Sequence, residues 1–328
     1  MSAFSPDEPA FVKQLCGGSR ISTAPWTGRS IRDNIQIASM PPGNLDIDLA
    51  AAPFDRFTTV QRLGADRRGH ASEHARHQLY VGRDRQTRLN LLIKLATRPG
   101  KVYQEDLENE IATLSTINRE LPDTRYFPIL YDHGHRRDGR VYLISTFFDE
   151  RPLAAALGTE WMPDRLVGHL TTALEIVKAV AALHGVQIFH VDLNPMNILH
   201  RVEKGRPIVR LVDFESSYDS ARHSSGVFYN PPTTTGYSAP EVSQQPPTAR
   251  ADVFSLGAVL YTMLAGYHWA ASGEPHARIE ADRNLDAELK KILLRAVASS
   301  PEERQGSAAE FGAALADYLE RSWPGRGW

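Results

Sequence analysis

Alternating apolar and polar positions from Phe54 onward predict a small antiparallel sheet. Three short runs have the composition of strands, with turn residues between them: FTTVQRLG, QLYVGRD and RLNLLIKLA. Next, QEDLENEIATLSTINREL has apolar residues at helical spacing and acidic residues in its first turns, which predicts a helix. The run YFPILYDHGHRRDGRVYLISTFF then indicates a hairpin that leads into an apolar strand.

Beyond Arg151 the apolar residues adopt helical spacing. DRLVGHLTTALEIVKAVAALHG predicts a long helix that Gly185 ends, and ARADVFSLGAVLYTMLAG predicts an almost wholly apolar one. LDAELKKILLRAVASSPEERQGSAAEFGAALADYL predicts two more helices joined by SPEERQGS. The sequence therefore predicts a sheet-and-helix region followed by a mostly helical one.

Residues 1–53 are rich in Gly, Pro and Ser and carry no sustained period, so we expect an extension outside the main domain. Two interpretations stay open. One is a partly disordered tail, and the other is a docking or autoinhibitory segment that packs on a partner. The apolar residues that favour the second are Trp26, Ile31, Ile35 and Ile37.

The composition is that of an ordinary globular protein, with 328 residues and 42% hydrophobic residues. A formal net charge of -2 argues against a nucleic-acid binder or a polybasic membrane binder, because both need excess Lys and Arg. The single cysteine, Cys16, cannot form an intrachain disulfide, so we expect a reducing compartment. No apolar stretch approaches the length of a membrane span, and the N-terminus carries acids where a secretory signal carries bases. These features predict a cytoplasmic protein, although a secreted effector with a non-classical export signal would share them.

The stretch IFHVDLNPMNILHRVEKGRPIVRLVDFE, from Ile188 to Glu215, carries the candidate chemistry. An apolar run, a polar loop and the run IVRLVDF predict two strands that flank a tight loop. Such a layout can aim Asp192, Asn197 and Asp213 at one point. Phosphoryl transfer from ATP to a hydroxyl needs this set: a carboxylate to accept the proton, and a carboxylate and an amide oxygen to hold Mg²⁺.

These residues resemble the motifs of a known family. HVDLNPMN resembles the H-R-D-L-x-x-x-N catalytic loop of Hanks-type, eukaryotic-like Ser/Thr protein kinases, and VDFE resembles their D-F-G metal motif. The resemblance covers about Phe54 to Leu319 and rests on several motifs in the right order. It implies an α+β, two-lobed protein-kinase-like fold, with a sheet-plus-helix N-lobe at 54–148 and a mainly helical C-lobe at 149–328. ATP and Mg²⁺, or Mn²⁺ in its place, would sit between the lobes.

The resemblance also implies roles for individual residues. Asp192 matches the base, Asn197 and Asp213 match the metal ligands, and Lys94 in LLIK matches the lysine that contacts the α and β phosphates. Glu110 best fits the glutamate that holds this lysine, with Glu108 as the fallback. The residues implied to bind the nucleotide, with Ser145 as gatekeeper and 146–148 as hinge, are Leu63, Gly64, Leu79, Leu92, Lys94, Ser145, Thr146, Phe147, Phe148 and Leu199.

After Asp213, ESSYDSARHSSGVFYNPPTTTGYSAPEV predicts a Ser/Thr-rich loop that resembles the activation segment and A-P-E anchor of the family. Small-molecule kinases with the same core generally lack that segment, so it favours a protein substrate. By the same resemblance, Arg304 pairs with Glu241 of the anchor, and Asp252 accepts backbone N–H groups near His190. A helix N-cap is the alternative role for Asp252.

The loop between the first two strands departs from the family pattern. ADRRGHASEHARH is longer than the Gly-rich flap, and His77 stands where its last glycine is expected, although two glycines remain, Gly64 and Gly69. Three arginines are candidates to supply positive charge instead: Arg67, Arg68 and Arg76. Three histidines could share one face, but a solvated loop is favoured over a metal site because no Cys or carboxylate completes the ligand set: His70, His74 and His77.

Three core positions also depart from the family. Val191 replaces the arginine before Asp192, so the usual link to a phosphorylated activation segment is missing. Asn194 replaces a lysine, which removes positive charge from the transferring phosphate. Glu215 replaces a glycine, which restricts the backbone and adds a carboxylate that is a further candidate metal ligand.

The favoured function is therefore a cytoplasmic Ser/Thr protein kinase. Two alternatives stay open. One is a pseudokinase scaffold that binds nucleotide without transfer, and the other is a different transfer from ATP, either nucleotidylation or phosphorylation of a small molecule.

Overall fold

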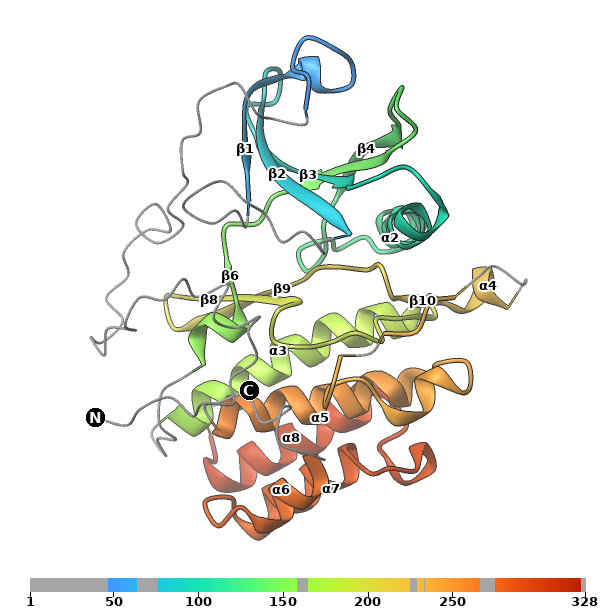
Figure 1. Cartoon of the computed structure of the whole chain (residues 1–328). Coiled ribbons are helices and arrows are strands. Elements are labelled where there is room, and N and C mark those ends of the chain that lie inside the picture. Colours follow the sequence, from blue (N-terminus) through green and yellow to red (C-terminus); the bar gives the residue numbers. More distant parts are fainter. Residues whose placement is uncertain are drawn as a thin grey trace, which may run out of the picture. The chain divides into compact units, whose positions relative to one another are not determined.

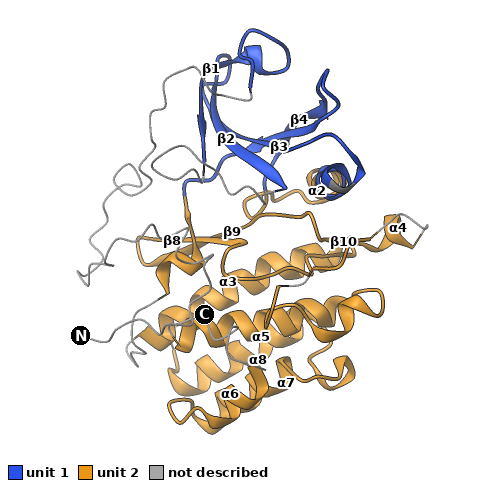
Figure 2. Ribbon diagram, in the orientation of Figure 1, with its two compact units in different colours: residues 1–111, 128–149 blue, residues 112–127, 150–328 orange. Residues whose placement is uncertain are grey.

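The computed structural model describes residues 47–63, 76–157, 165–224, 229–232, 234–265 and 275–325. Its contacts divide the chain into two compact units (Figure 2): residues 1–111 with 128–149, and residues 112–127 with 150–328. These units differ from the predicted lobes mainly in residues 112–127, which belong to the second unit. The apolar residues at 26, 31, 35 and 37 and Cys16 lie outside the described residues.

The first unit is built on a five-stranded antiparallel sheet in the order β1-β2-β3-β5-β4 (Figure 1). This unit and the helix that leaves it contain the predicted strands, hairpin and helix. The elements are η2 (Phe54–Arg56), β1 (Phe57–Arg62), β2 (His77–Asp84), β3 (Asn90–Ala96), α2 (Lys101–Glu120), β4 (Leu130–His135) and β5 (Val141–Thr146).

The sheet has a different core on each face, because successive side chains of a strand point to opposite sides. The α2 face packs Val141 and Leu143 against Leu107 and Ile111. The other face also buries Ile47, from the predicted extension, so ordered packing begins before Phe54. The buried residues of that face are Ile47, Phe54, Phe57, Val60, Tyr80, Leu91, Ile93, Leu95, Tyr142 and Ile144.

The second unit is mostly helical after the end of α2 (Figure 1). Its long helices α3, α5, α7 and α8 are those that the apolar spacing predicts. The elements are β6 (Arg151–Pro152), η3 (Leu153–Ala156), α3 (Leu166–Gly185), β7 (Ile188–Phe189), β8 (Ile198–Glu203), β9 (Arg206–Leu211), β10 (Tyr218–Asp219), α4 (Ser220–His223), η5 (Pro240–Ser243), α5 (Ala249–Ala265), α6 (Pro275–Ala281), α7 (Ala287–Ala296), η7 (Pro301–Glu303) and α8 (Ala308–Ser322).

The helix α3 packs against α5, α8 and β9. Gly312 of α8 allows a close approach, because a Cβ there would lie 2.6 Å from Cγ1 of Val177 on α3. Among the described helices, α3 alone is long and apolar enough to cross a membrane, but the core helix of a folded domain has the same length and composition. The helix ends at Gly185 as predicted, although the left-handed residue after it is Gln187, with φ 58°.

The stretch from Ile188 to Glu215 differs from the predicted two strands around one tight loop. The strand β8 lies inside that loop and pairs with β9, whereas β7 pairs with β10 in a separate two-stranded sheet. A two-residue turn joins β8 to β9, with left-handed φ values of 50° at Lys204 and 77° at Gly205, which are typical of a type I′ hairpin. The predicted loop after Asp213 is also partly regular, since it contains β10 and α4.

Candidate active site

Lys94 and Glu110 form the predicted ion pair in the first unit. Nζ of Lys94 lies 2.7 Å from Oε2 of Glu110, and the two residues are only 7% and 5% exposed. The fallback residue, Glu108, is exposed, and its Oε1 lies 3.5 Å from Nε2 of His135. Glu110 is therefore the residue that fixes the lysine.

The register of the sheet places several predicted nucleotide residues on the face that carries Lys94. Leu79 lies directly opposite Lys94, and Leu92 lies directly opposite Ser145. Opposed residues share a face, so these four side chains project to one side of the sheet. Leu63 continues the pairing of β1 and β2, because its N–H donates to the carbonyl of Leu79 at 2.8 Å.

One of the predicted hinge residues, Thr146, is hydrogen-bonded within the sheet. The N–H of Thr146 donates to the carbonyl of Ile129 at 2.9 Å, and the Thr146 hydroxyl accepts the N–H of Ile129 at 3.0 Å. Thr146 therefore belongs to the sheet ladder rather than offering its amide to adenine. Phe147 and Phe148, both half-buried, follow the strand as the remaining hinge residues.

Most of the predicted flap lies outside the described residues, including Gly64, Gly69, Arg67, Arg68, His70 and His74. His77 begins β2 and pairs with Ala96, and its φ is not left-handed, so this position does not require glycine. Arg76, a candidate for charge near the phosphates, contacts Asp106 of α2 in the structure.

In the second unit, Asp252 fixes the catalytic-loop backbone as predicted. Its carboxylate accepts the N–H of His190 at 2.9 Å and the N–H of Val191 at 2.7 Å. Asp252 is fully buried within α5 rather than preceding it, so the alternative N-cap role is wrong. Nε2 of His184 also lies 2.9 Å from this carboxylate.

The anchored backbone is strained at Val191. Its φ is 66°, a left-handed value that β-branched residues rarely adopt. The side chain is buried, whereas the arginine expected by resemblance would carry a charge here. The hydrogen bonds that the backbone N–H groups of His190 and Val191 donate to Asp252 stabilise this conformation and thereby set the direction of Asp192, the next residue.

Both oxygens of the Asp192 carboxylate accept hydrogen bonds. The Thr234 hydroxyl donates to Oδ1 at 2.6 Å, and Nδ2 of Asn197 donates to Oδ2 at 3.1 Å. Burial raises the pKa of the Asp192 carboxyl above its usual value, and the Thr234 hydrogen bond opposes this shift. Asp192 is thus an oriented carboxylate with increased basicity.

The hairpin of β8 and β9 brings Asn197 and Asp213 together. Ile198 lies opposite Leu211, and one residue further out the N–H of Val212 donates to the carbonyl of Asn197 at 3.0 Å. Asp213 directly follows Val212 and has a left-handed φ of 67°. The two predicted metal ligands therefore leave neighbouring ends of one hairpin.

Two other predicted site residues near this hairpin, Glu215 and Leu199, are half-buried. Glu215 is half-buried and its φ is not left-handed, so the backbone here does not need the glycine of the family motif. Leu199 is half-buried in β8, opposite Arg210 and Pro152.

Asn194, which stands in place of a lysine, is part of the loop structure. Its Nδ2 donates to the carbonyl of Asp192 at 3.1 Å, and its Oδ1 accepts the N–H of Met196 at 2.9 Å. The side chain is buried and braces the loop on which Asp192 lies.

Thr234 is a site residue for which sequence reasoning proposed no contact with Asp192. It lies in the run Thr233 to Thr235, where composition indicates only a hydroxyl-rich loop. Its partner is 42 residues away in the chain. The fixed spacing to Glu241 of the A-P-E anchor, seven residues further on, is the signal that could have separated Thr234 from its neighbours.

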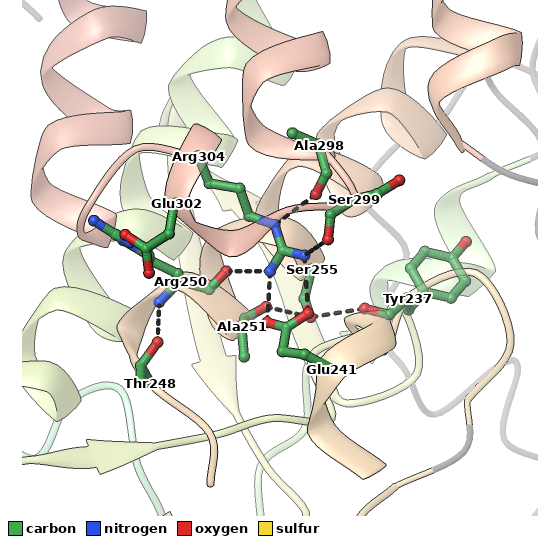
Figure 3. Close-up of polar contacts among 10 residues, drawn as sticks. All are labelled: Tyr237, Glu241, Thr248, Arg250, Ala251, Ser255, Ala298, Ser299, Glu302 and Arg304. Atoms are coloured by element: carbon green, nitrogen blue, oxygen red, sulfur yellow. Dashed lines mark hydrogen bonds and ion pairs between the residues drawn. The ribbon is translucent and has the colours of Figure 1, made fainter. Parts of the chain in front are cut away.

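The A-P-E anchor has the predicted ion pair (Figure 3). The guanidinium of Arg304 binds both oxygens of Glu241, at 2.7 and 2.9 Å, and donates to the carbonyls of Arg250, Ala298 and Ser299. The Arg304 side chain is fully buried and also stacks over the ring of Phe254. The end of the activation segment is therefore fixed to the helical core.

A model of the protein kinase domain family matches residues 78–317 of this chain. Among curated proteins, the chain is 31% identical over 196 residues to the serine/threonine-protein kinase Pkn1 of Myxococcus xanthus, covering 54% of this chain and 27% of that protein. It is 24% identical over 264 residues to the serine/threonine-protein kinase pkn3 of the same organism, covering 72% and 46%. The chain thus spans less than half the length of these relatives.

Among solved structures, the chain is similar to the PknI kinase domain of Mycobacterium tuberculosis. The TM-score is 0.56 at 20% sequence identity, and the match covers 80% of this chain and 96% of that one. At this identity the similarity concerns the fold.

Proposed function

Because the chain belongs to the protein kinase domain family, we propose that it is an ATP-dependent kinase that phosphorylates serine or threonine in a protein substrate. The observation that best supports this is the arrangement around Asp192. A hydroxyl and an amide orient its two carboxylate oxygens, and the amide belongs to Asn197, which is hydrogen-bonded next to Asp213.

In this proposal Asp192 accepts the proton of the substrate hydroxyl. Its carboxylate must be ionised to do so, and burial increases the proton affinity of the ionised form. Thr234 and Asn197 hold the carboxylate in one orientation, which favours proton transfer along one direction.

The residues present fit ATP and Mg²⁺. Mg²⁺ prefers oxygen ligands, and Nδ2 of Asn197 is the atom that faces Asp192, so its Oδ1 can bind the metal together with Asp213. Lys94, held by Glu110, would contact the phosphates. When bound, the metal neutralises charge on the phosphates, and Mn²⁺ could replace Mg²⁺ with the same ligands.

The anchored activation segment supports a protein substrate over a small molecule. Arg304 and Glu241 fix the end of this segment, which positions Thr234 beside Asp192. A cytoplasmic location is part of the same proposal and rests on the single cysteine and the composition of the chain.

One departure from the family, at Asn194, predicts a slow enzyme. Asn194 carries no charge and uses both ends of its side chain within the loop, so it does not neutralise the transferring phosphoryl group. Stabilisation then depends on Lys94 and the metal.

The test is to incubate the purified protein with ATP, Mg²⁺ and a mixture of generic protein substrates, and to locate new phosphate by mass spectrometry. Phosphoserine or phosphothreonine that needs both ATP and metal would support the proposal. Nucleotidyl groups on protein, phosphate on a small molecule alone, or no transfer with any metal would each contradict it, and the last result would favour a scaffold.

A further inference from the structure

Four aromatic side chains pack together beside the start of the catalytic loop. The ring of His223 stacks on that of Tyr218 with their centroids 4.8 Å apart, and the ring of Phe189 lies nearly parallel to that of Tyr218 at 6.5 Å. The ring of Tyr229 makes T-shaped contacts with Tyr218 at 5.1 Å and with His223 at 5.5 Å. Stacked and T-shaped contacts are the favourable arrangements of aromatic pairs. We call these four residues the ring cluster.

Three of the four rings are buried and fixed by the backbone that carries them. Phe189 of β7 and Tyr218 of β10 are opposed residues of the two-stranded sheet. The strand β10 runs directly into the short helix α4 (Figure 1), where the Asp219 carboxylate accepts the N–H of Ala221 at 3.0 Å. Nδ1 of His223, the last residue of α4, lies 2.9 Å from both the N and the O atom of Asp219.

Tyr229, the fourth member, is held in the ring cluster by its ring alone. Its hydroxyl is buried and has no hydrogen-bond partner among the described residues. A buried hydroxyl without a partner costs free energy, so the hydroxyl does not explain the position of this side chain. The contacts of the ring explain it, and a phenylalanine would make the same contacts.

The loop that carries Thr234 lies between Tyr229 and Tyr237, and its C-terminal side is fixed independently of the ring cluster. The Tyr237 hydroxyl lies 2.9 Å from the hydroxyl of Thr262 on α5. The Tyr237 carbonyl accepts the hydroxyl of Ser255, also on α5, at 2.7 Å. On the N-terminal side of Thr234, the corresponding contact is that of Tyr229 with the ring cluster.

We propose that the ring cluster fixes the N-terminal side of this loop, and that Tyr229 is thereby a positioning residue for Asp192 that acts through Thr234. The Thr234 hydroxyl must lie at one point to donate to the Asp192 carboxylate, and a loop fixed on both sides has fewer conformations that place it elsewhere. Removing the Tyr229 ring releases one side, so the hydrogen bond forms only part of the time. This inference rests on the proposed function for the role of Asp192, but not for the order of the loop.

Tyr229→Ala should lower kcat by about 5-fold, whereas Tyr229→Phe should keep kcat within about 2-fold of wild type because it retains the ring. Tyr229→Ala should also move the acidic limb of the pH–rate profile to higher pH, because the Thr234 hydrogen bond lowers the pKa of Asp192. The other groups that act on this pKa are unchanged in the variant: His190, Asp213 and Asn194.

The matched control is Trp323→Ala. It removes a half-buried ring that makes a T-shaped contact with Tyr318 at the end of α8, and it should change neither kcat nor the pH–rate profile.

A double variant tests whether Tyr229 acts through Thr234. Thr234→Val removes the donor itself, so adding Tyr229→Ala to it should lower kcat by no more than about 2-fold further. Effects of the two changes that multiply would overturn the inference. Wild-type activity of Tyr229→Ala, or a Tyr229→Phe variant as impaired as Tyr229→Ala, would also overturn it.

Hydrogen exchange tests the ring cluster without catalysis. The backbone amides of residues 218–224 and 234–238 should exchange faster in Tyr229→Ala, and as in wild type in Tyr229→Phe and Trp323→Ala. If wild type shows no transfer, the proposed function fails while this exchange pattern still tests the role of Tyr229 in ordering the loop. Unchanged exchange in Tyr229→Ala would overturn the inference.

Discussion

The hydroxyl of Thr234 donates a hydrogen bond of 2.6 Å to Oδ1 of Asp192. This bond joins the activation segment to the catalytic loop within the second unit. The other oxygen of Asp192 accepts from Asn197, so each carboxylate oxygen has a separate donor. The orientation and the protonation of the proposed base therefore both depend on Thr234.

Thr234→Val should lower kcat by about 10-fold or more, because the base loses one of the two donors that orient it. In wild type the hydrogen bond from Thr234 lowers the pKa of Asp192. The valine variant lacks this bond, so the pKa should rise and the acidic limb of the pH–rate profile should move to higher pH. Thr234→Ser keeps the hydroxyl and should retain both rate and profile. A valine variant with the wild-type profile would show that the bond does not act on the base.

Asp192→Asn should not destabilise the fold at neutral pH. Burial raises the folded-state pKa of Asp192 above its usual 3.8, so its stabilising contribution is present below that value and lost as pH rises through the folded pKa. At pH 7 the ionised carboxylate costs stability that asparagine does not. We expect an equal or higher Tm for the variant at pH 7, with the difference shrinking toward about pH 4. A lower Tm at pH 7 would contradict the sign of this pKa shift.

Ser224 lies in the Ser/Thr-rich loop after Asp213 and is a candidate phosphorylation site by composition alone, and phosphate on it should leave the basal rate almost unchanged. By family resemblance, the residue that would bind this phosphate is an arginine directly before Asp192. Here that position is Val191, which is buried and uncharged. Ser224→Ala and Ser224→Glu should therefore have the same kcat. As a contrast, Thr234→Glu should abolish transfer, because it places a second carboxylate beside Asp192. A marked activation by Ser224→Glu would mean that another cationic residue binds the negative charge at this position.

Arg304→Met should lower the free energy of unfolding by about 3–5 kcal/mol, because Glu241 would remain largely buried without its partner. The neighbouring pair of Arg250 and Glu302 provides a matched control (Figure 3), since Glu302 is 81% exposed. Arg250→Met should cost about 1 kcal/mol or less. Denaturant titrations of the two variants measure both values. Equal losses would show that burial does not make the Arg304–Glu241 ion pair contribute more to stability than the Arg250–Glu302 ion pair.

The sequence was sufficient for contacts that a short motif defines. Lys94 with Glu110, Asp252 with the backbone near His190, and Arg304 with Glu241 each combine an ionisable residue with a fixed place in an element order. Amphipathic spacing likewise predicted the long helices and the strands of the large sheet. These features depend on local patterns, which the sequence displays directly.

The sequence was insufficient where the partner is distant and the local signal is common. Asp106 is one of several acids on α2, and only the fold shows that it is buried against Arg76. The strand β8 was missed because its run, ILHRVE, is short and half polar, although the Lys204–Gly205 turn could have indicated the hairpin.

The central claim is that Asp192 accepts a proton during transfer of the γ-phosphoryl group of ATP. The most direct measurement compares ATP labelled at the γ phosphate with ATP labelled at the α phosphate, using wild type and Asp192→Asn with Mg²⁺. We predict that wild type transfers only the γ label to protein, and that Asp192→Asn lowers this by about 10²-fold or more while still binding nucleotide. Transfer of the α label, no transfer by wild type, or an unimpaired Asp192→Asn variant would contradict the account.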